Sequence, residues 1–505
     1  MRLLTAGEMR QADRAASTVH GVPVARLMEN AGRAVAEIAR AQSASGRVVV
    51  YAGAGNNGGD GFVAARRLRE AGLSVEVWLA VPAERISGEA RENLDRLRGL
   101  GVAVAGGAPP ALRRGDLGLD ALLGTGLSRP PEGRFSEGIR ALNAGREAGA
   151  RVIAVDVPSG LDADTGRTPG LCVAAHLTVT LGAAKRGLAL EPGASLAGEI
   201  RVGDIGIPAE ALLAISSRVE RLDEDDVRGL FRPRPREAHK GEEGHLLVVA
   251  GSPGKAGAAA LAVRGGLRGG SGLVTLASRR AVVDRLWTVA PEAMGAALPG
   301  EGPLALGDLP ALRAAAEGKD ALAVGPGLPR GSETAECLAG LLAGFDGPAV
   351  LDADALNALA GRLDLLGRAK GPIVVTPHPG EMARLAGRTV AEVQADRIGA
   401  AQALAEEHGV TVVLKGARTV VASEGAVWIV PTGNPGMATG GTGDVLCGLV
   451  GALLAQRHPA AEAARAAAYV HGLAGDLAAA RRGERGLIAS DVAEAIGEVW
   501  SRWRL

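Results

Sequence analysis

Aromatic residues are scarce in this sequence, and cysteine is scarcer still. Only 2% of the 505 residues are aromatic, and the three cysteines, Cys172, Cys337 and Cys447, are far apart and form no CxxC pair. This pattern argues against a disulfide framework and against a thiolate zinc site. It favours a reducing compartment, so we expect a cytoplasmic protein.

An excess of charge of one sign and a long apolar run are also missing. The 56 basic residues balance the 56 acidic ones, and no basic block offers a footprint for nucleic acid or an anionic membrane. The first residues, MRLLTAGEMRQADR, lack the apolar core of a signal peptide, and the longest apolar run, 445–455, is too short to span a bilayer. We therefore expect small-molecule partners, no nucleic acid and no membrane, and a homo-oligomer.

Short apolar runs alternate with helical patterns along the whole chain. The run RVVVYA precedes a helical pattern at 60–71, and HLLVVAGS precedes another at 256–269. Between the two series lies FRPRPREAHKGEEGH, whose proline, arginine and glycine content is typical of an irregular surface segment. The alternation predicts parallel sheets covered on both faces, hence two three-layer α/β domains, at 1–222 and 223–505.

The stretch GAGNNGGDG, 53–61, follows the first strongly apolar strand pattern. It contains Gly53-x-Gly55-x-x-Gly58, a spacing that brings backbone N–H groups and a helix start to one point, where a phosphate can bind. Nine successive loop-forming residues favour a nucleotide-sized ligand over ordinary turn chemistry. An NAD-dependent dehydrogenase is disfavoured, because the only acid of the second strand, Glu76, lies in mid-strand and not at the end that meets a ribose.

Two further carboxylates stand at predicted strand ends in this half. Asp120 precedes the turn GTGL, and Asp156 ends the strand RVIAVD. Each could simply cap the following loop. Because carboxyl ends of parallel strands meet at one edge, we instead expect them to converge with the first glycine loop.

The first 215 residues resemble NAD(P)H-hydrate epimerases in EMRQAD, MENAGRAVA, GAGNNGGDG, DALLGTGL and DVPSGLDADTG. The resemblance implies a Rossmann-like domain with Asp156 as the catalytic acid–base residue, which also contacts the hydrated nucleotide. It implies a K⁺ site of hard oxygen ligands, at Asn57, Asp120 and Ser159. The implied nucleotide-binding residues are Asn56, Asn57, Gly58, Gly59, Asp60, Gly124, Thr125, Gly126, Leu127, Ser128, Arg129 and Pro130.

The second half contains NPGMATGGTGDVL, 434–446, where a glycine run opens an apolar helix pattern. Backbone N–H groups at Gly441, Thr442 and Gly443 would form an anion site there, and no Walker A sequence is present. Asp444 could be a helix-start acid favoured by the helix dipole, or a base that activates a hydroxyl toward a phosphoryl group.

Residues 225–500 resemble the ADP- or ATP-dependent NAD(P)H-hydrate dehydratases of the ribokinase-like fold, in GSPGKAGAAALA, VGPGL, LDADALN, TPHPGEMARL, VLKG and GNPGMATGGTGDVL. The resemblance implies that Asp444 is the catalytic base and that Mg²⁺ accompanies the ADP or ATP. It places Ala258, Gly327, His378 and Asp444 against the hydrate, and Lys415, Gly416, Ala417, Arg418, Thr419 and Gly443 against the adenine nucleotide. From the residues alone, His378 could equally brace its loop, and Lys415 could be a solvated strand end.

Two other features have simpler interpretations. The charged pattern at 389–408, which includes Arg397, is most simply the solvated face of one helix, and His471 within AAAYVHGLAGDLA is a core-lining residue by default.

Taken together, the two halves predict a bifunctional enzyme that repairs damaged nicotinamide cofactors. One site would interconvert the R and S epimers of NAD(P)HX at C6, and the other would dehydrate the S epimer to NAD(P)H with ADP or ATP. The main alternative is a ribokinase-like vitamin-precursor kinase fused to a nucleotide-binding domain. A non-catalytic binding module is the second alternative.

Overall fold

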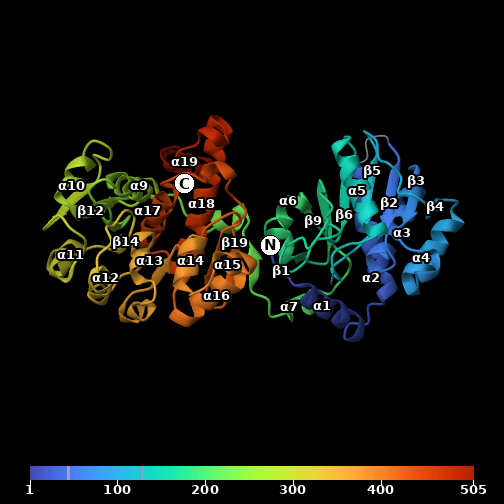
Figure 1. Ribbon diagram of the computed structural model, residues 1–505, viewed down its shortest axis with the longest axis horizontal. Helices are drawn as coiled ribbons and strands as arrows, with labels where there is room; N and C mark the ends of the chain where they lie inside the picture. The colour runs from blue at the N-terminus through green and yellow to red at the C-terminus, as the bar shows by residue number, and fades with distance from the viewer. Residues whose placement is uncertain (43–45, 128) are drawn as a thin grey trace. The chain divides into compact units, whose positions relative to one another are not determined.

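The computed structural model describes residues 1–42, 46–127 and 129–505. They fold as two compact units, Met1–Val219 and Glu220–Leu505. Each unit is a sheet covered by helices on both faces, so the predicted α/β class with two three-layer units is confirmed (Figure 1).

The N-terminal unit is built on a seven-stranded sheet with the order β4-β3-β2-β5-β6-β7-β9, and every pair is parallel. Its strands are β2 (Val48–Ala52), β3 (Val75–Leu79), β4 (Ala103–Ala105), β5 (Leu117–Ala121), β6 (Arg151–Val155), β7 (Leu177–Leu181) and β9 (Glu199–Gly203). The chain winds outward in opposite directions from β2 and β5. The topological switch point, where such sheets bind ligands, therefore lies between these two strands.

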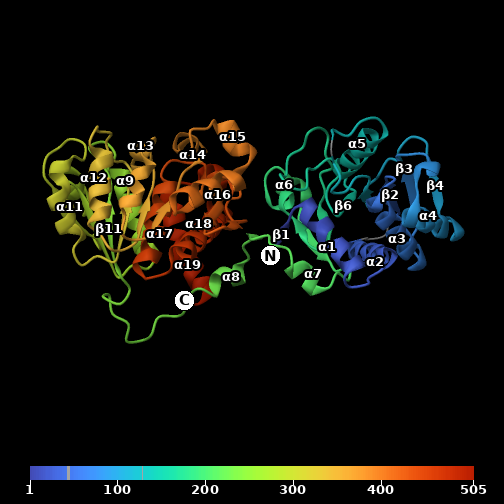
Figure 2. The ribbon, with the colours of Figure 1, turned by 90° about the horizontal axis from the view of Figure 1, so that it is seen from below.

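Helices cover both faces of this sheet, as Figure 2 shows. Val48, Val50 and Ala52 point into a core under α2 (Val24–Gln42), α3 (Asn56–Glu70) and α4 (Gly88–Gly99). Val49 and Tyr51 point into a second core under α5 (Arg134–Glu147). Strands buried on both faces explain the continuous apolar runs in the sequence.

Short elements complete this unit. They are α1 (Ala6–Thr18), α6 (Gly193–Ala197), α7 (Ala209–Leu213) and a two-stranded parallel sheet of β1 (Leu3–Leu4) with β8 (Ala184–Lys185). A capping box opens α1, since Thr5 Oγ1 accepts from Glu8 N at 3.1 Å and Glu8 Oε2 accepts from Thr5 N at 2.7 Å.

The C-terminal unit is built on a ten-stranded sheet with the order β10-β19-β18-β17-β16-β15-β14-β11-β12-β13. Its strands are β10 (Val219–Arg221), β11 (His245–Val249), β12 (Leu273–Arg279), β13 (Met294–Leu298), β14 (Ala321–Val324), β15 (Ala349–Leu351), β16 (Ile373–Val375), β17 (Thr411–Leu414), β18 (Val420–Ser423) and β19 (Ala426–Ile429). Pairs from β13 to β17 are parallel, and β18 and β19 form an antiparallel hairpin. The switch point here lies between β11 and β14.

In Figure 1 one layer of helices lies above this sheet and another lies below it. The upper layer contains α9 (Ala256–Arg268), α10 (Arg280–Leu286), α17 (Thr442–Ala455), α18 (Ala460–Arg482) and α19 (Ala489–Trp503). The lower layer contains α11 (Leu309–Ala316), α12 (Thr334–Ala343), α13 (Asp354–Leu359), α14 (Pro379–Leu385), α15 (Val390–Ala395) and α16 (Arg397–His408). The one long helix predicted over 389–408 is therefore wrong, because Asp396 leaves the helical conformation and caps α16 by accepting from Gly399 N at 2.8 Å.

Glycines let α9 and α17 approach closely. A Cβ added at Gly448 would lie 1.9 Å from Ala262 O, and one added at Gly265 would lie 2.2 Å from Val445 O. Only a hydrogen fits at either place. These contacts hold the middle and the C-terminal part of α9 against the N-terminal half of α17.

The irregular segment that follows the boundary between the two units is anchored at its start. Helix α8 (Glu224–Arg228) begins this segment, and its Glu224 Oε1 accepts from Trp503 Nε1 at 2.8 Å. Phe231 packs edge-on against Trp500, with 5.0 Å between the ring centroids. Much of the chain's small aromatic content is thus gathered at this anchor. Within the described residues, every helix is too short or too polar to cross a membrane.

Candidate active sites

The first site lies at the switch point of the N-terminal sheet. Gly53 N donates to Ala121 O at 3.0 Å, and a Cβ at Gly53 would lie 2.1 Å from Leu122 O. The turn after β2 and the turn after β5 therefore touch, as expected from the strand ends. Helix α3 begins at Asn56, earlier than the predicted residue 60, so NNGGDG forms its first turns and is not a loop.

Two of the glycines in this motif have packing roles. A Cβ at Gly58 would lie 2.2 Å from Gly53 O, and one at Gly59 would lie 2.6 Å from Met28 Cε. Close packing of the first turn of α3 thus explains these two residues before any ligand is considered. Glu76 is held by Arg47 Nη1 at 2.5 Å, which agrees with the absence of a ribose-binding role in this strand.

Asn57 has the polar atoms in the first site that most clearly lack a partner. The residue is only 9% exposed, and within the described part of the chain neither its Oδ1 nor its Nδ2 has a hydrogen-bond partner. A Cβ at Gly124 would lie 3.3 Å from Asn57 Cβ, so the turn after β5 lies directly against this amide. An unpaired buried amide is costly, which indicates that a ligand completes it.

Asp120 and Ser159 are joined by two hydrogen bonds. Asp120 accepts from Ser159 Oγ at 2.5 Å and from Ser159 N at 2.7 Å. Both residues are fully buried, and burial raises the pKa of Asp120 to about 6 despite these bonds. Amide, carboxylate and hydroxyl oxygens of this kind suit an alkali cation, whose charge would also compensate the buried carboxylate.

Asp156 follows β6 in a left-handed backbone conformation, with φ at 66°. Such a conformation is rare outside glycine and is often found where a side chain is aimed for function. Its Oδ1 accepts from Leu181 N at 3.0 Å and from Lys185 Nζ. Lys185 is 1% exposed and also donates to Leu181 O at 2.8 Å.

Two more carboxylates surround this pair. Burial is the main cause that raises the pKa of Asp60 well above its ordinary value, and the charges of Asp156 and Asp13 raise it further. Asp13, on α1, also has a raised pKa because of burial, and its Oδ1 is buried with no partner among the residues described. Three acids thus share one ammonium group, so protons are retained in this cluster.

The sequence interpretation missed Lys185 and Asp13. Lys185 lies in GAAKRG, outside any motif that we singled out, and β8 brings it to Asp156 from 29 residues away. Asp13 belongs to EMRQAD, which we used for the resemblance without giving this acid a role. Of the predicted ligand-binding residues after β5, Ser128 lies outside the described residues, while Gly124–Leu127 and Arg129–Pro130 form the turn between β5 and α5.

The second site lies at the N-terminal end of α17. Gly441, with φ at 94°, precedes the helix, and Asp444 is in its first turn. Burial raises the pKa of Asp444 to about 7, and the charge of Asp352 adds to the effect. The helix dipole that favours an anion here is therefore outweighed, and the carboxyl titrates near neutrality, as a general base requires.

Lys415 lies beside this turn in a buried ion pair. Its Nζ donates to Asp352 Oδ1 at 2.5 Å and lies 3.9 Å from Glu381 Oε2, and a Cβ at Gly443 would be 3.2 Å from the same Nζ. The interpretation of Lys415 as a solvated strand end is therefore wrong. An ammonium group beneath converging N–H groups suits a phosphate.

His378 is the N-cap of α14. Its Nδ1 accepts from Gly380 N at 3.0 Å and from Glu381 N at 3.3 Å, while Glu381 Oε2 accepts from His378 N at 2.8 Å. His378 thus braces its own loop, which is one of the two roles that the sequence left open for it. Because Nδ1 accepts, Nε2 carries the proton of the neutral ring. This Nε2 lies 3.3 Å from Glu381 Oε1, and half of the side chain is exposed.

Two of the four residues predicted to face the hydrate, Ala258 and Gly327, adjoin each other. Gly327, with φ at 67°, would bring a Cβ to 3.0 Å from Ala258 Cβ, and Ser252 Oγ donates to Gly327 O at 2.8 Å. The loops after β11 and β14 therefore meet at the N-terminal end of α9.

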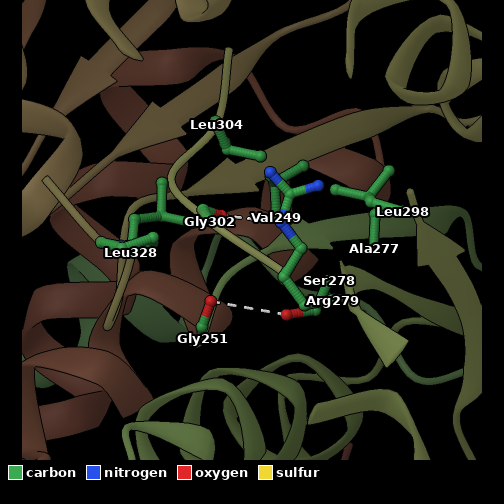
Figure 3. A pocket seen from close by; sticks show the side chains of 10 residues that line it. Val249, Gly251, Ala277, Ser278, Arg279, Leu298, Gly302, Leu304 and Leu328 are labelled. Atoms are coloured by element: carbon green, nitrogen blue, oxygen red, sulfur yellow. Dashed lines mark hydrogen bonds between the residues drawn. The ribbon is translucent and has the colours of Figure 1, made fainter. Parts of the chain in front are cut away.

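A small pocket lies beside this point, with room for no more than about one water molecule. Figure 3 shows the Arg279 side chain among its lining residues, with Gly251, Ser278, Leu328 and Leu304 around it. The guanidinium of Arg279 is fully engaged, because its donors reach both oxygens of Asp308 at 2.7 and 2.8 Å and three backbone carbonyls. Arg279 is therefore a structural residue of this part of the unit.

The nucleotide loop, Lys415–Thr419, is held by a residue that we misassigned. Arg397 Nη2 donates to Leu414 O at 3.0 Å and to Lys415 O at 3.3 Å, and burial lowers the pKa of this guanidinium to about 10. Its placement on a solvated helix face is therefore wrong. Within the loop, Thr419 Oγ1 donates to Gly416 O at 3.0 Å, and Arg418 has φ at 56°.

His471 is buried, as a core-lining residue would be, but it also supports the second site. Its Nε2 donates to Thr442 O at 2.9 Å, in the turn that carries Asp444. Burial lowers its pKa to about 4, so the ring is neutral near pH 7. Asp352 and Glu381, within LDADALN and TPHPGEM, had no assigned role in the sequence; only their packing against Lys415 reveals one.

Comparison with known families divides the chain at the same place. Residues 24–187 match the family described as YjeF-related protein N-terminus. Residues 246–498 match the family described as NAD(P)H-hydrate dehydratase.

Whole-chain relatives are similar over nearly all their length. A bifunctional NAD(P)H-hydrate repair enzyme Nnr of Moorella thermoacetica is 45% identical, with 97% of this chain and 95% of that protein covered. The enzyme of the same name from Escherichia coli is 36% identical, with 96% and 92% covered.

A solved structure matches the C-terminal unit. It is an ADP/ATP-dependent NAD(P)H-hydrate dehydratase from Bacillus subtilis, co-crystallised with ATP/Mg²⁺, at 33% identity and a TM-score of 0.51. The match covers 57% of this chain and 100% of that one.

Proposed function

This chain belongs to the family of bifunctional NAD(P)H-hydrate repair enzymes, and from that membership we propose how its two sites share the reaction. It is an epimerase and an ADP- or ATP-dependent dehydratase in one polypeptide, acting on NAD(P)H hydrated at C6. The single observation that supports the residue roles best is that each predicted catalytic carboxylate has a buried lysine beside it or beside its turn.

In the N-terminal site Asp156 is the acid–base residue. Epimerisation requires the C6–O bond to break with a proton supplied to the departing hydroxyl, and water to return on either face of the ring. Lys185 fixes the Asp156 carboxylate, and Asp60 is a carboxyl kept protonated beside it by burial. Proton transfer by positioned groups of this kind accelerates reactions by about 10²–10⁴-fold.

Asn57, Asp120 and Ser159 would hold K⁺ next to this chemistry. The fit rests on the unpartnered amide of Asn57 and on the buried carboxylate of Asp120, whose charge has no cation near it among the described residues. A bound K⁺ would supply a fixed positive charge that helps to hold the nucleotide and the turn after β5.

In the C-terminal site Asp444 is the base. It takes the proton of the C6 hydroxyl as that oxygen attacks the terminal phosphorus of ATP or ADP, which arrives with its Mg²⁺. The phosphate then leaves C6 and a proton leaves C5, which restores the C5–C6 double bond of the reduced cofactor. Gly441–Gly443 and Lys415 stabilise the charge on the transferred group.

The remaining roles follow the same arrangement. Ala258, Gly327 and the Nε2–H of His378 would contact the hydrate, and Lys415–Thr419 with Gly443 would contact the nucleotide. The vitamin-precursor kinase is disfavoured, because full-length relatives are repair enzymes that carry both halves. Three free thiols support a cytoplasmic location.

A mixture of both NADHX epimers tests the proposal directly. With K⁺, Mg²⁺ and ATP, the wild type should convert all of it to NADH, followed by absorbance of the reduced nicotinamide. D156N should stop at the fraction present as the S epimer, and D444N should convert none. If the wild type restores no NADH with either ADP or ATP, the dehydratase assignment is wrong.

A further inference from the structure

Asp352 is a buried carboxylate with one engaged and one free oxygen. It is the first residue after β15 and is 1% exposed. Its Oδ1 accepts from Lys415 Nζ at 2.5 Å, whereas its Oδ2 is buried and, within the described ranges, has no hydrogen-bond partner. Retaining such a group is costly, so it needs an explanation beyond the single ion pair.

The free oxygen faces the first turn of α17. A Cβ added at Gly443 would lie 3.8 Å from Asp352 Oδ2 and 3.2 Å from Lys415 Nζ. The carboxylate and the ammonium therefore lie side by side against the residue that precedes Asp444. The next residue, Ala353, has φ at 50°, a conformation that directs the chain from β15 straight into α13.

Several charged and titratable groups meet around Asp444. Asp352, Asp354 and Glu381 raise its pKa, burial being the largest cause, and Lys415 acts in the opposite direction. The Cys447 thiol, one turn along α17, is neutral because burial raises its pKa. His378 is neutral because burial lowers its pKa. Among these neighbours Asp352 is the acid with the largest influence on Asp444.

Asp352 also determines the state of Lys415. Burial alone would lower the pKa of this ammonium group, but Asp352 first and Glu381 second raise it. Without Asp352 the ammonium would keep only Glu381, at 3.9 Å. Its position under the glycine turn thus depends on the 2.5 Å bond to Asp352.

We propose that Asp352 is a positioning residue of the dehydration reaction. Through Oδ1 it holds the Lys415 ammonium beneath the phosphate-binding turn, and through its second oxygen it keeps a negative charge against Asp444. It acts through these two groups and touches neither substrate. The inference rests on the proposed function, in which Asp444 is the base and Lys415 meets the nucleotide.

The test measures kcat for dehydration of S-NADHX by the full-length chain with ATP and Mg²⁺, from about pH 5.5 to about pH 9. D352N should lower kcat by about 100-fold, as loss of a charge-stabilising contact does. It should also move the acidic limb of the profile to lower pH, because removing the negative charge favours the ionised Asp444. A role in folding alone would not move this limb.

D320N is the matched control. Asp320 directly precedes β14, so it lies at the amino-terminal ends of the parallel strands, whereas Asp352 lies at their carboxyl ends. Its Oδ2 accepts from His245 N at 2.8 Å. D320N should leave both kcat and the position of the acidic limb unchanged. D352E keeps the charge but shifts the oxygens, so it should keep the limb near its wild-type position while kcat falls.

The outcomes separate this inference from the function beneath it. If the wild type restores no NADH, the proposed function fails. If the wild type is active and D352N retains its kcat or an unmoved limb, the inference is overturned. Should D352N not fold, a wild-type kcat in D352E overturns it equally.

Discussion

Each site uses a carboxylate whose proton affinity is set by burial. Asp444 has a pKa of about 7, and Asp120 has one of about 6. Sequence motifs alone do not distinguish the pKa of either residue from that of a surface aspartate. The low dielectric around them, with few partners, is what makes the first a base near neutral pH and the second a charge that needs a cation.

The dehydration rate should therefore depend on pH through Asp444. The ionised carboxylate is the active form, so kcat should fall as pH drops below about 7, the value at which burial places its pKa. A kcat profile at saturating nucleotide measures this directly. A rate that stays constant down to pH 5 would contradict the assignment of Asp444 as base.

Loss of the Lys185 ammonium should disable epimerisation. K185M leaves the Asp156 carboxylate without the ammonium group that holds it, in a site that already contains Asp13 and Asp60, so the epimerisation rate should fall by about 100-fold or more. Exchange between the two epimers, followed without nucleotide, measures the effect.

Dehydration of pure S-NADHX by the same variant should be unaffected. K319Q, which changes a half-buried lysine of the other unit, is the control for epimerisation and should match the wild type. Equal epimerase rates in K185M and K319Q would exclude a role for Lys185.

At the scale of elements, α9 packs closely against α17, the helix that bears Asp444 in its first turn. G448A would place a methyl group 1.9 Å from Ala262 O, so the two helices must separate. We expect a loss of about 1–3 kcal/mol in the free energy of unfolding of the C-terminal unit, as overpacking typically causes. Dehydration should be strongly reduced and epimerisation retained.

G497A is the control for that variant. Gly497 lies inside α19, and a Cβ there meets nothing within 4 Å. Alanine should thus be neutral or stabilise the unit by up to about 1 kcal/mol. Thermal unfolding of both variants tests the contrast, and equal melting temperatures would show that the close helix contact has no energetic importance.

His471 links α18 to the same turn and makes stability depend on pH. The pKa of the buried ring is about 4 in the folded state, below its value in the unfolded chain, so the unfolded chain binds the extra proton between these two values. Stability contributed by the neutral ring is complete above about pH 6.5 and is lost as pH falls toward 4, by up to about 3 kcal/mol.

Replacement of His471 by glutamine should flatten this part of the dependence. Glutamine offers an N–H donor for Thr442 O but does not titrate. Urea unfolding at several pH values compares the two proteins. A wild-type slope that survives in H471Q would mean that another group is responsible.

Sequence patterns predicted the strands well because buried parallel strands are continuous apolar runs, as in VVVYA and HLLVV. They also indicated that Asp120 and Asp156 lie at strand ends. Because the carboxyl ends of parallel strands meet on one side of a sheet, the two residues could be expected to lie near the first glycine motif. They could not reveal Lys185, Asp352 or Arg397, because each acts through a partner distant in the sequence. Helix α3 was placed too late, since glycines that lower helix propensity are there to permit close packing.

At the scale of the whole molecule, the two units carry separate chemistry on separate sheets. Hydration of the reduced nicotinamide cofactor yields two epimers, and a dehydratase that accepts one of them leaves the other unrepaired. Fusion of the two activities in a single chain keeps them in equal amounts. Under the proposed function each site has its own ionic requirement, with K⁺ at the first and the Mg²⁺–nucleotide complex at the second.

Removal of K⁺ should therefore divide the overall reaction. With Mg²⁺ and ATP present but K⁺ replaced by a large organic cation, a mixture of epimers should yield NADH only up to the fraction present as the S epimer. The buried Asp120 and the unpartnered Asn57 amide would be left without the charge that joins them. Addition of K⁺ should restart the reaction and carry it to completion. Complete conversion without K⁺ would show that these three oxygen ligands serve the fold of the turn and not a cation, whereas a loss of dehydration of pure S epimer would place the K⁺ requirement in the other unit.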